Sequence, residues 1–281
     1  MKKPVKGIDH VVVMVDDIEA AKSAYEKLGF QVQPRGHHRK LGTANHLMIF
    51  DEDYFEILGI VADSPFNAER REWLKAGGGL ANVALATDGA DLAFDALRQA
   101  GLEPDPPLFF DRAVEVAGTT EHAKFRTVRI PKRHMPVVGL FVCEHQTPEL
   151  VYRPEWARHP NGARGLLAVT VIAEQPEKWI ATLERYFGAA SVTRQASGIS
   201  VDTGTQPIRY LDRRAYASRY PGVAAVRPDD HAAALTVRVD SLAACEALLA
   251  KNGVRFVNPA AGRLVVPPDQ AAHLTVEFAG R

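Results

Sequence analysis

Two residues of types that bind metal ions lie within the first sixty positions of the chain. His10 lies in the apolar run 7–15, and Glu56 lies in a second run, 54–59. Both runs are rich in β-branched and aromatic residues between glycine and aspartate, which predicts strands. Imidazole nitrogen and carboxylate oxygen are both ligands of divalent cations. If the two side chains share one concave face of a sheet, they form part of a divalent-metal site.

The alternation of side chains along a strand indicates which face each residue occupies. His10 shares its face with Met14, while the alternate valines at 11, 13 and 15 point the other way. A face made of valine is suited to packing against a helix, which leaves His10 on the opposite, concave side. The same alternation places Tyr54 on one face with Glu56.

The segment between these runs supplies the elements that position them. Residues 18–28 have apolar side chains at helical spacing, and Gly29 follows at the usual C-terminal position of a helix. A further strand is predicted from residue 43 to residue 50. The first sixty residues therefore predict a β-α-β-β-β unit with the histidine in its first strand and the glutamate in its last.

The same strand-helix-glycine pattern recurs three times along the chain. The recurrences cover residues 79–101, 166–188 and 233–253. We therefore predict an α+β fold of four β-α-β-β-β modules in two pairs. The first domain is expected at 5–150, with the metal site, and the second at 163–281. The proline- and tryptophan-containing segment 147–162 is expected to connect them.

Composition excludes several classes of function. Lysine plus arginine and aspartate plus glutamate number 34 each, so bulk charge favours neither nucleic acid nor an anionic membrane. The polar residues Asp9 and His10 come too soon for a signal-peptide core, and no apolar run approaches the roughly 20 residues of a membrane span. Two cysteines are too few for a disulfide framework. We expect a cytoplasmic enzyme or binding protein with a small-molecule ligand.

These motifs resemble those of the vicinal oxygen chelate superfamily, and within it the glyoxalase-like proteins. The resemblance is carried by DHVV at 9–12, GTAN at 42–45, YFEIL at 54–58 and the repeated module. It is good over residues 5–160 and weaker over 163–280. It implies that two modules pair into a cupped sheet holding a divalent metal. First-strand histidine and last-strand glutamate would supply ligands, and the metal would bind two adjacent oxygens of the substrate.

Carried over residue by residue, this resemblance gives the expected ligands. His10 and Glu56 fill both positions of the first module. In the second module Asn82 stands where His10 would be, and the last strand ends at Glu144 and His145. These two point to opposite faces, so only one can serve. We expect His145 as the third ligand, with Glu144 as the alternative, around one divalent ion of Fe, Zn, Ni, Mn or Mg.

The second half of the chain departs from the ligand pattern. The position of His10 is held by Ala168 or Val169 in the third module and by Ala234 in the fourth. Glu277 alone matches Glu56. We therefore expect residues 163–281 to be a structural or substrate-covering half.

Four residues are candidates for contact with a substrate. Met14 and Tyr54 share the faces of the two expected ligands. His46 either contacts the substrate or is a solvated strand residue, and Arg153 pairs with a carboxylate of the protein or of the substrate.

Other conspicuous residues have structural interpretations. The adjacent His37 and His38 point apart in the charged segment 35–40, which favours a solvated loop, although this loop could cap the cup and attract an anionic substrate. Cys143 is expected in the core. Tyr152 and Trp156 are expected to fix the connecting segment by aromatic burial.

The predicted function is that of a metal-dependent enzyme acting on a small oxygen-rich metabolite, with the metal as Lewis acid. Isomerase or lyase chemistry would also need a general base, for which Glu144 is the candidate when His145 is a ligand. A ring-cleaving dioxygenase would hold iron through His10, His145 and Glu56. The alternative is a non-catalytic protein that sequesters a drug-like molecule, as some relatives do. The chain could also form a homodimer.

Overall fold

The computed structural model describes residues 5–116 and 118–280. The first pair of modules follows the predicted order, with one additional helix, α2, between its two modules. The elements of this pair are β1 (Ile8–Met14), α1 (Ile18–Lys27), β2 (Gly36–His38), β3 (Thr43–Ile49), β4 (Tyr54–Ile60), α2 (Ala68–Lys75), β5 (Gly79–Ala86), α3 (Ala90–Gln99), β6 (Leu108–Val116), β7 (Thr119–Arg129) and β8 (Gly139–His145).

The second pair repeats this order and also has a helix, α5, between its modules. Its elements are β9 (Ala163–Ile172), α4 (Ile180–Phe187), β10 (Val192–Gln195), β11 (Gly198–Asp202), β12 (Pro207–Leu211), α5 (Arg213–Arg219), β13 (His231–Val239), α6 (Leu242–Lys251), β14 (Arg263–Val266) and β15 (Thr275–Ala279). In the fourth module a single bridge between Val257 and Val265 stands in place of one strand. The prediction of an α+β fold of four paired modules is confirmed.

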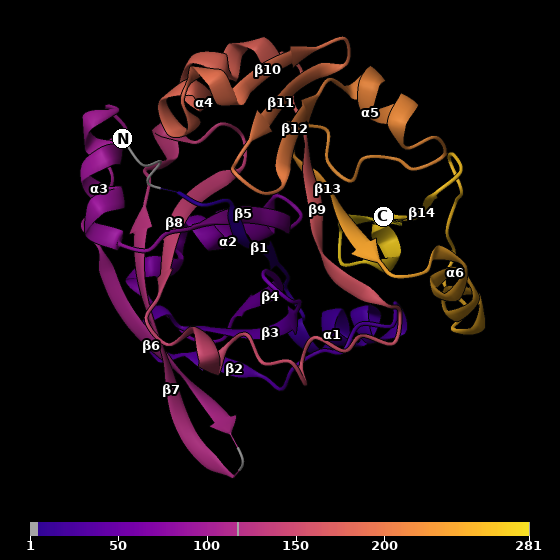
Figure 1. Ribbon diagram of the computed structural model, residues 1–281, viewed down its shortest axis with the longest axis horizontal. Helices are drawn as coiled ribbons and strands as arrows, with labels where there is room; N and C mark the ends of the chain where they lie inside the picture. Colours follow the sequence, from indigo (N-terminus) through magenta and orange to yellow (C-terminus); the bar gives the residue numbers. More distant parts are fainter. Residues whose placement is uncertain (1–4, 117, 281) are drawn as a thin grey trace.

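The sheet places the first and last strands of each module side by side. Strand β1 runs parallel to β4, and β5 runs parallel to β8, while β1 and β5 are antiparallel at the centre of the first pair. Strands β9 and β13 form the same antiparallel centre in the second pair. A single pairing, Ala232 of β13 with Leu80 of β5, joins the two halves into one sheet (Figure 1). Strands β6 and β7 form a long hairpin that projects from the body.

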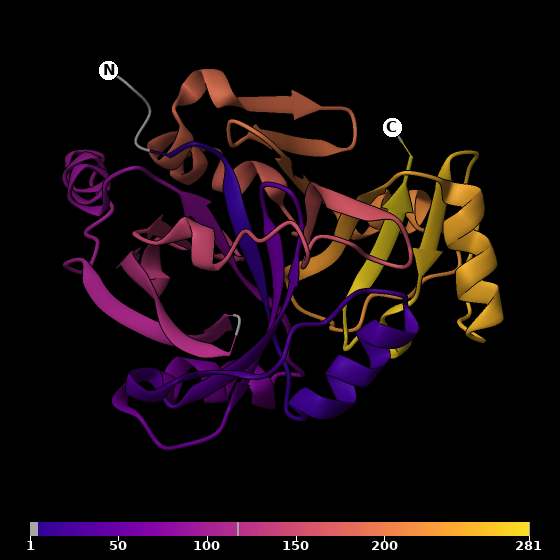
Figure 2. The same ribbon diagram turned by 60° about the horizontal axis from the view of Figure 1, so that its bottom comes forward.

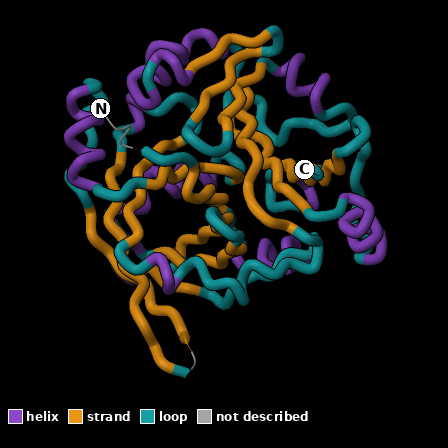
Figure 3. Tube along the Cα trace, viewed as in Figure 1, coloured by secondary structure: helices purple, strands orange, loops and turns teal. Residues whose placement is uncertain are grey.

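Helices cover the outside of the sheets, and strands form the interior (Figure 3). As predicted, Val11 and Val13 of β1 lie in the apolar core. Asp17 caps the N-terminus of helix α1, because its Oδ1 accepts hydrogen bonds from the backbone N–H groups of Glu19 and Ala20. No helix of the described part of the chain is long and apolar enough to span a membrane.

The two halves share one hydrophobic core. Helix α1 lies beside the strands of the fourth module (Figure 2), and the hydroxyl of Tyr25 donates a hydrogen bond of 2.8 Å to the carbonyl of Ala271. The rings of Phe30 and Phe278 stack with centroids 5.8 Å apart. Gly29 has a φ of +84°, and a Cβ there would come within 2.5 Å of Leu248, so this contact between halves requires glycine.

The connecting segment is held by His159. Its Nδ1 accepts a hydrogen bond from the backbone N–H of Gln31 at 2.9 Å, and its Nε2 donates to the carbonyl of Ile49 at 2.8 Å. The first bond requires a neutral ring, because a protonated Nδ1 cannot accept. Burial lowers the pKa of His159 from 6.5 to about 4, and this effect outweighs the bond to Ile49.

This buried histidine predicts a loss of stability in acid. Between pH 6.5 and pH 4 the unfolded chain binds a proton at His159 that the folded chain does not bind, so the free energy of unfolding should fall by about 3 kcal/mol. Urea unfolding across this range should show a weaker pH dependence in His159→Gln, whose amide can make both hydrogen bonds without titrating. Equal pH dependence in the parent and the variant would contradict the assignment.

Candidate functional site

His10 lies between two carboxylates. It is buried, its Nδ1 lies 2.5 Å from Asp9 Oδ2, and its Nε2 lies 3.8 Å from Glu56 Oε2. The ring of Tyr54 stacks on the imidazole at 4.2 Å. The pairing of β1 with β5 shifts register between Ile8 and His10, at the position of Asp9. Because Asp9 accepts at Nδ1, the Nε2 lone pair of a neutral His10 faces Glu56.

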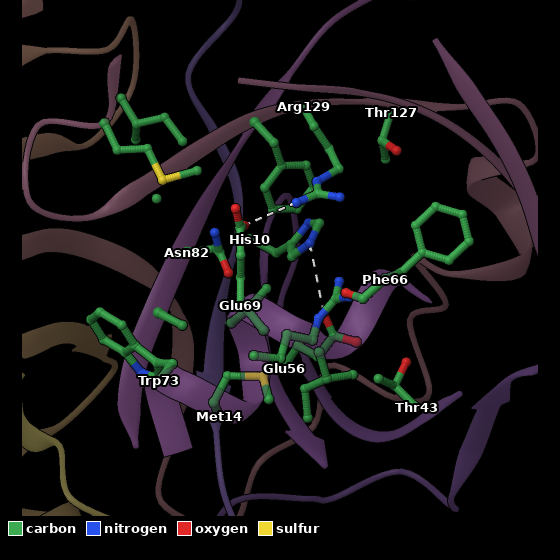
Figure 4. A pocket seen from close by; sticks show the side chains of 18 of the residues that line it. His10, Met14, Thr43, Glu56, Phe66, Glu69, Trp73, Asn82, Thr127 and Arg129 are labelled. Atoms are coloured by element: carbon green, nitrogen blue, oxygen red, sulfur yellow. Dashed lines mark hydrogen bonds and ion pairs between the residues drawn. The ribbon is translucent and has the colours of Figure 1, made fainter. Parts of the chain in front are cut away.

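Glu56 is held in place from the next strand. The side-chain amide of Asn45 donates a hydrogen bond of 2.6 Å to Glu56 Oε1, which leaves Oε2 toward His10. Glu56 lies directly beside Val12 in the pairing of β4 with β1, so backbone register fixes its distance from His10. Figure 4 shows the two side chains facing each other across the floor of a pocket.

This pocket is a cavity of about 560 Å³ in the first half. Its floor is polar and contains His10, Asn45, Glu56 and Asn82. Its walls are largely apolar and aromatic: Val12, Met14, Leu47, Tyr54, Leu58, Leu108, Phe110, Phe125 and Phe141. The second half also reaches the cavity, through Trp179, Arg227, Asp229 and Asp230. The cavity is therefore large enough for a small metabolite and is completed by both halves of the chain.

His145 and Glu56 do not surround a common position where one ion could bind. In the described chain, the group of at least three possible ligand side chains whose ligand atoms all lie within 4.8 Å of one another is Asp9, His10, Cys143 and His145. Glu56 is outside this group, and His145 does not line the cavity. His10 thus has Asp9 and His145 on one side and Glu56 on the other. The predicted set of His10, Glu56 and His145 is divided by the imidazole of His10.

Asp9 is the centre of the group behind His10. Its Oδ2 accepts hydrogen bonds from His10 and from His145 Nε2 at 3.0 Å, and its Oδ1 accepts from the hydroxyl of Tyr152 at 2.8 Å. Burial alone would raise the pKa of Asp9, but the charge of His145 and the bonds from both histidines together hold that pKa well below its usual value. Asp9 is therefore an anion with its acceptor positions filled. Burial raises the pKa of the nearby Cys143 thiol.

The register of the second module explains why a third ligand is missing near Glu56. In the first module Glu56 lies beside Val12, two residues after His10. In the second, the residue beside Ala84, two after Asn82, is Phe141. The position equivalent to Glu56 is thus Phe141, four residues before His145. From the sequence, the position equivalent to Glu56 was expected at the end of β8, because the length of the segment before a strand does not determine the register of that strand.

Glu144 lies on the opposite, helical face of β8. Its Oε2 accepts a hydrogen bond of 2.8 Å from the backbone N–H of Ala90, in the first turn of α3, and lies 3.6 Å from Arg126 Nη1. Glu144 does not line the cavity. The expectation that Glu144 and His145 face opposite ways agrees with this geometry, but the structure does not place Glu144 where it could act on a ligand of the cavity.

The predicted substrate-contact residues divide into two groups. Met14 and Tyr54 line the cavity. His46 faces α1 instead, where its Nε2 lies 3.3 Å from Glu19 Oε1, and its Nδ1 donates to the carbonyl of Gln33 at 2.8 Å. Arg153 pairs with Glu155 and lies over the ring of Trp156, and it does not line the cavity.

Sequence reasoning missed two cavity residues, His38 and Arg112. The interpretation of 35–40 as a solvated loop is wrong for His38, which is buried in β2, 3.1 Å from Thr43 Oγ1. Burial lowers its pKa to about 4, opposed by Glu56 and reinforced by Arg112. No sequence signal placed His38 in the cavity, because its face depends on the pairing of β2 with β3, where His38 lies opposite Thr43. The signal at Arg112 was alternation, because Arg112 interrupts the face of Leu108, Phe110 and Val114.

The second half has lost this site. Register places Ala168, Ala234, Arg209 and Glu277 at its four equivalent positions. Glu277 is completely buried and accepts hydrogen bonds from Arg219, Tyr220 and Thr236. The rings of Tyr216 and Tyr220 pack in this cup with the surrounding apolar side chains. In the second half Arg209 thus stands at the position of Glu56, and an ion-paired carboxylate, Glu277, stands at the position of Phe141.

The comparisons with known proteins are consistent with this geometry. A family model described as a glyoxalase-like domain matches residues 8–187. No curated protein matches the chain significantly. Many solved structures are similar to this chain, among them three that share low sequence identity with it. A hypothetical protein from Staphylococcus aureus is 12% identical, with 98% of this chain and 99% of that chain covered and a TM-score of 0.69.

The other two structures are of enzymes or enzyme fusions. A mutant of 4-hydroxymandelate synthase from Streptomyces coelicolor is 13% identical, with coverage of 99% and 93% and a TM-score of 0.63. A fusion of a xylose isomerase-like TIM barrel with 4-hydroxyphenylpyruvate dioxygenase is 14% identical, with a TM-score of 0.56, and the match covers 99% of this chain and 49% of that chain. At these identities the likeness concerns the fold.

The contacts of Asp9 predict the effect of removing one of its partners. Tyr152→Phe leaves a buried carboxylate oxygen without its donor, so the free energy of unfolding should fall by about 1.5–3 kcal/mol. Tyr54→Phe is the matched control, because the Tyr54 hydroxyl has no hydrogen bond among the described residues, and its loss should cost much less. Urea unfolding of both variants measures the difference; equal losses would show that Asp9 does not depend on Tyr152.

Proposed function

Because the chain belongs to the glyoxalase-like family of the vicinal oxygen chelate superfamily, we propose that it is a metal-dependent enzyme acting on a small oxygen-rich metabolite. The ion would be divalent and held by His10 Nε2 and Glu56 Oε2 on the cavity floor. The observation that carries this proposal is the pairing of those two atoms, 3.8 Å apart, at the only face of Glu56 that Asn45 leaves free.

The donor set fits a divalent ion with open coordination positions. Two ligand atoms each about 2.1 Å from one ion lie roughly 3–4 Å apart, and a separation of 3.8 Å is too long for a hydrogen bond. Asp9 fixes the imidazole through Nδ1, an arrangement common around ligating histidines. The nearby Asn82 offers an amide oxygen at best. Few protein ligands leave room for two oxygens of a substrate.

The remaining groups of the cavity have assignable tasks. A bound ion would polarise substrate oxygens as a Lewis acid. The apolar walls exclude water from the ligand, and Tyr54 holds the His10 ring by stacking. His38 replaces Glu144 as the candidate general base, because it lines the cavity and burial, which lowers its pKa to about 4, keeps it neutral near pH 7, although weakly basic. In the tautomer whose Nδ1–H donates to Thr43 Oγ1, Nε2 would accept the proton.

Metal content of purified variants tests the proposal. Untagged parent protein should bind about one equivalent of divalent metal by elemental analysis, and Glu56→Gln should lose most of it, because the amide removes the charge. Asp9→Asn should bind metal roughly 10- to 100-fold more weakly, because His10 loses its anchor.

His145→Gln and Cys143→Ala separate the two candidate positions for the ion. Both variants should keep the metal if it lies between His10 and Glu56. Loss of metal in these two variants, with retention in Glu56→Gln, would place the ion in the group of Asp9, His10, Cys143 and His145 and refute the proposed site.

A metal-free sequestering protein is the second candidate. The observation that favours it is the pair Asn82 and Phe141, which occupy two of the four equivalent ligand positions of the first half. A sequestering protein should be isolated without metal and should bind a flat apolar molecule equally well before and after dialysis against a chelator. Metal-dependent affinity would exclude this candidate.

A further inference from the structure

Arg112 is a buried cation without a counter-ion. It lies in β6 with 6% of its surface exposed and lines the cavity. Within residues 5–116 and 118–280 its guanidinium has no hydrogen bond and no ion pair, and its Nη2 is completely buried without a partner. Burial lowers the pKa of Arg112, as expected for a cation held away from water. An unpaired buried charge is costly, so a partner absent from the chain is indicated.

The other arginines that line the cavity already have partners. Arg129 pairs with Glu69, and Arg227 pairs with Asp229, both at distances of direct contact, while Arg70 donates a hydrogen bond to the carbonyl of Phe66. Glu56 is the carboxylate that acts on Arg112 electrostatically, but the two are not within ion-pair distance. An ion bound at Glu56 would also neutralise that carboxylate. Among the described residues, Arg112 is therefore the arginine of this cavity whose guanidinium is left for a ligand.

The backbone around Arg112 is shaped to admit its guanidinium. A Cβ at Gly36 would lie 2.9 Å from Arg112 Nη1 and 2.4 Å from Asn45 Oδ1. Glycine at this position lets the guanidinium lie against β2. Asn45 Oδ1 is itself buried without a hydrogen-bond partner. The guanidinium of Arg112, a donor, and Asn45 Oδ1, an acceptor, thus both lack partners beside Gly36.

The surroundings of Arg112 are apolar. Alternation along β6 places Leu108 and Phe110 on the same face as Arg112. The ring of Phe110 stacks on that of Phe125 at 5.2 Å and meets the His38 ring edge-on at 5.7 Å. A ligand that reaches Arg112 must therefore place an apolar body along this wall.

We propose that Arg112 binds the carboxylate of the substrate, and that the substrate is a small carboxylic acid with a flat apolar body. The planar guanidinium matches the two oxygens of a carboxylate in a bidentate pair. The carboxylate supplies the missing counter-charge, and the body of the molecule lies against Phe110 while its other oxygens reach the floor at His10 and Glu56. This inference rests on the proposed function for the position of those oxygens, but the Arg112 contact does not require the metal.

Benzoate and its neutral analogue benzamide serve as probes, titrated calorimetrically into full-length protein with and without added Mn²⁺. The parent should bind benzoate at least about tenfold more tightly than benzamide in both states. Arg112→Met, of similar length and without charge, should lose about 10- to 100-fold in benzoate affinity while benzamide binding is unchanged. Arg112→Lys, which keeps the charge but not the planar guanidinium, should bind benzoate with intermediate affinity.

Thermal unfolding without ligand separates a binding role from a structural one. If the charge of Arg112 awaits a ligand, Arg112→Met should melt at a higher temperature than the parent, because it removes an uncompensated buried cation. A lower melting temperature would assign Arg112 a structural role and overturn the inference. So would a parent that does not saturate with benzoate or does not distinguish it from benzamide, or equal benzoate affinity in parent and Arg112→Met.

The metal content of Arg112→Met separates this inference from the proposed function. Arg112→Met should retain as much metal as the parent. Benzoate binding that depends on Arg112 in a protein without metal affinity would refute the metal-dependent function and leave the carboxylate site standing. Metal binding at Glu56, together with equal benzoate affinity in the parent and Arg112→Met, would refute the carboxylate site and leave the metal-dependent function standing.

Discussion

The buried carboxylate of Asp9 is the interaction on which the site depends. It joins three parts of the chain that are distant in sequence, namely β1 through His10, β8 through His145 and the connecting segment through Tyr152. A buried anion is stable only when its acceptor positions are filled, and breaking such a set is costly. Asp9 therefore fixes the orientation of His10, and with it the separation of Nε2 from Glu56.

The two halves of the chain show how the same module serves different purposes. In the first half the space between the strands is a cavity with a polar floor. In the second half Tyr216 and Tyr220 pack within the cup, and Glu277 is neutralised by Arg219 and Arg263. The second half still contributes Trp179, Arg227, Asp229 and Asp230 to the first cavity. It is thus both a scaffold and part of the cavity wall.

The sequence was sufficient to predict what strand alternation and internal repetition determine. The modules, the valine face of β1 and the placing of His10, Glu56, Met14 and Tyr54 on the concave side follow from periods of two and of about 3.6 residues. The prediction of two domains, 5–150 and 163–281, did not anticipate that Tyr25 and Phe30 would pack into the other half. Contacts of this kind depend on how modules pack, which no local pattern records.

Features that depend on register or on burial of a charge could not be predicted. The equivalence of Phe141 and Glu56 follows from the pairing of β5 with β8. Because this register could not be read from the sequence, the third ligand was expected at His145. His46 was expected either to contact the substrate or to be solvated, but it is buried on the face opposite to Thr43, Asn45 and Leu47, which line the cavity. Arg112 stands in a mostly apolar stretch of sequence, residues 108–116. Only its position in the folded chain shows that it has no partner.

The central claim is that one divalent ion is held between His10 Nε2 and Glu56 Oε2. Anomalous diffraction from crystals soaked in Mn²⁺, recorded on both sides of the absorption edge, locates the ion directly. We predict a single strong peak within about 2.3 Å of both atoms, on the cavity side of His10. A peak among Asp9, Cys143 and His145, or no peak at full soaking concentration, would contradict this account.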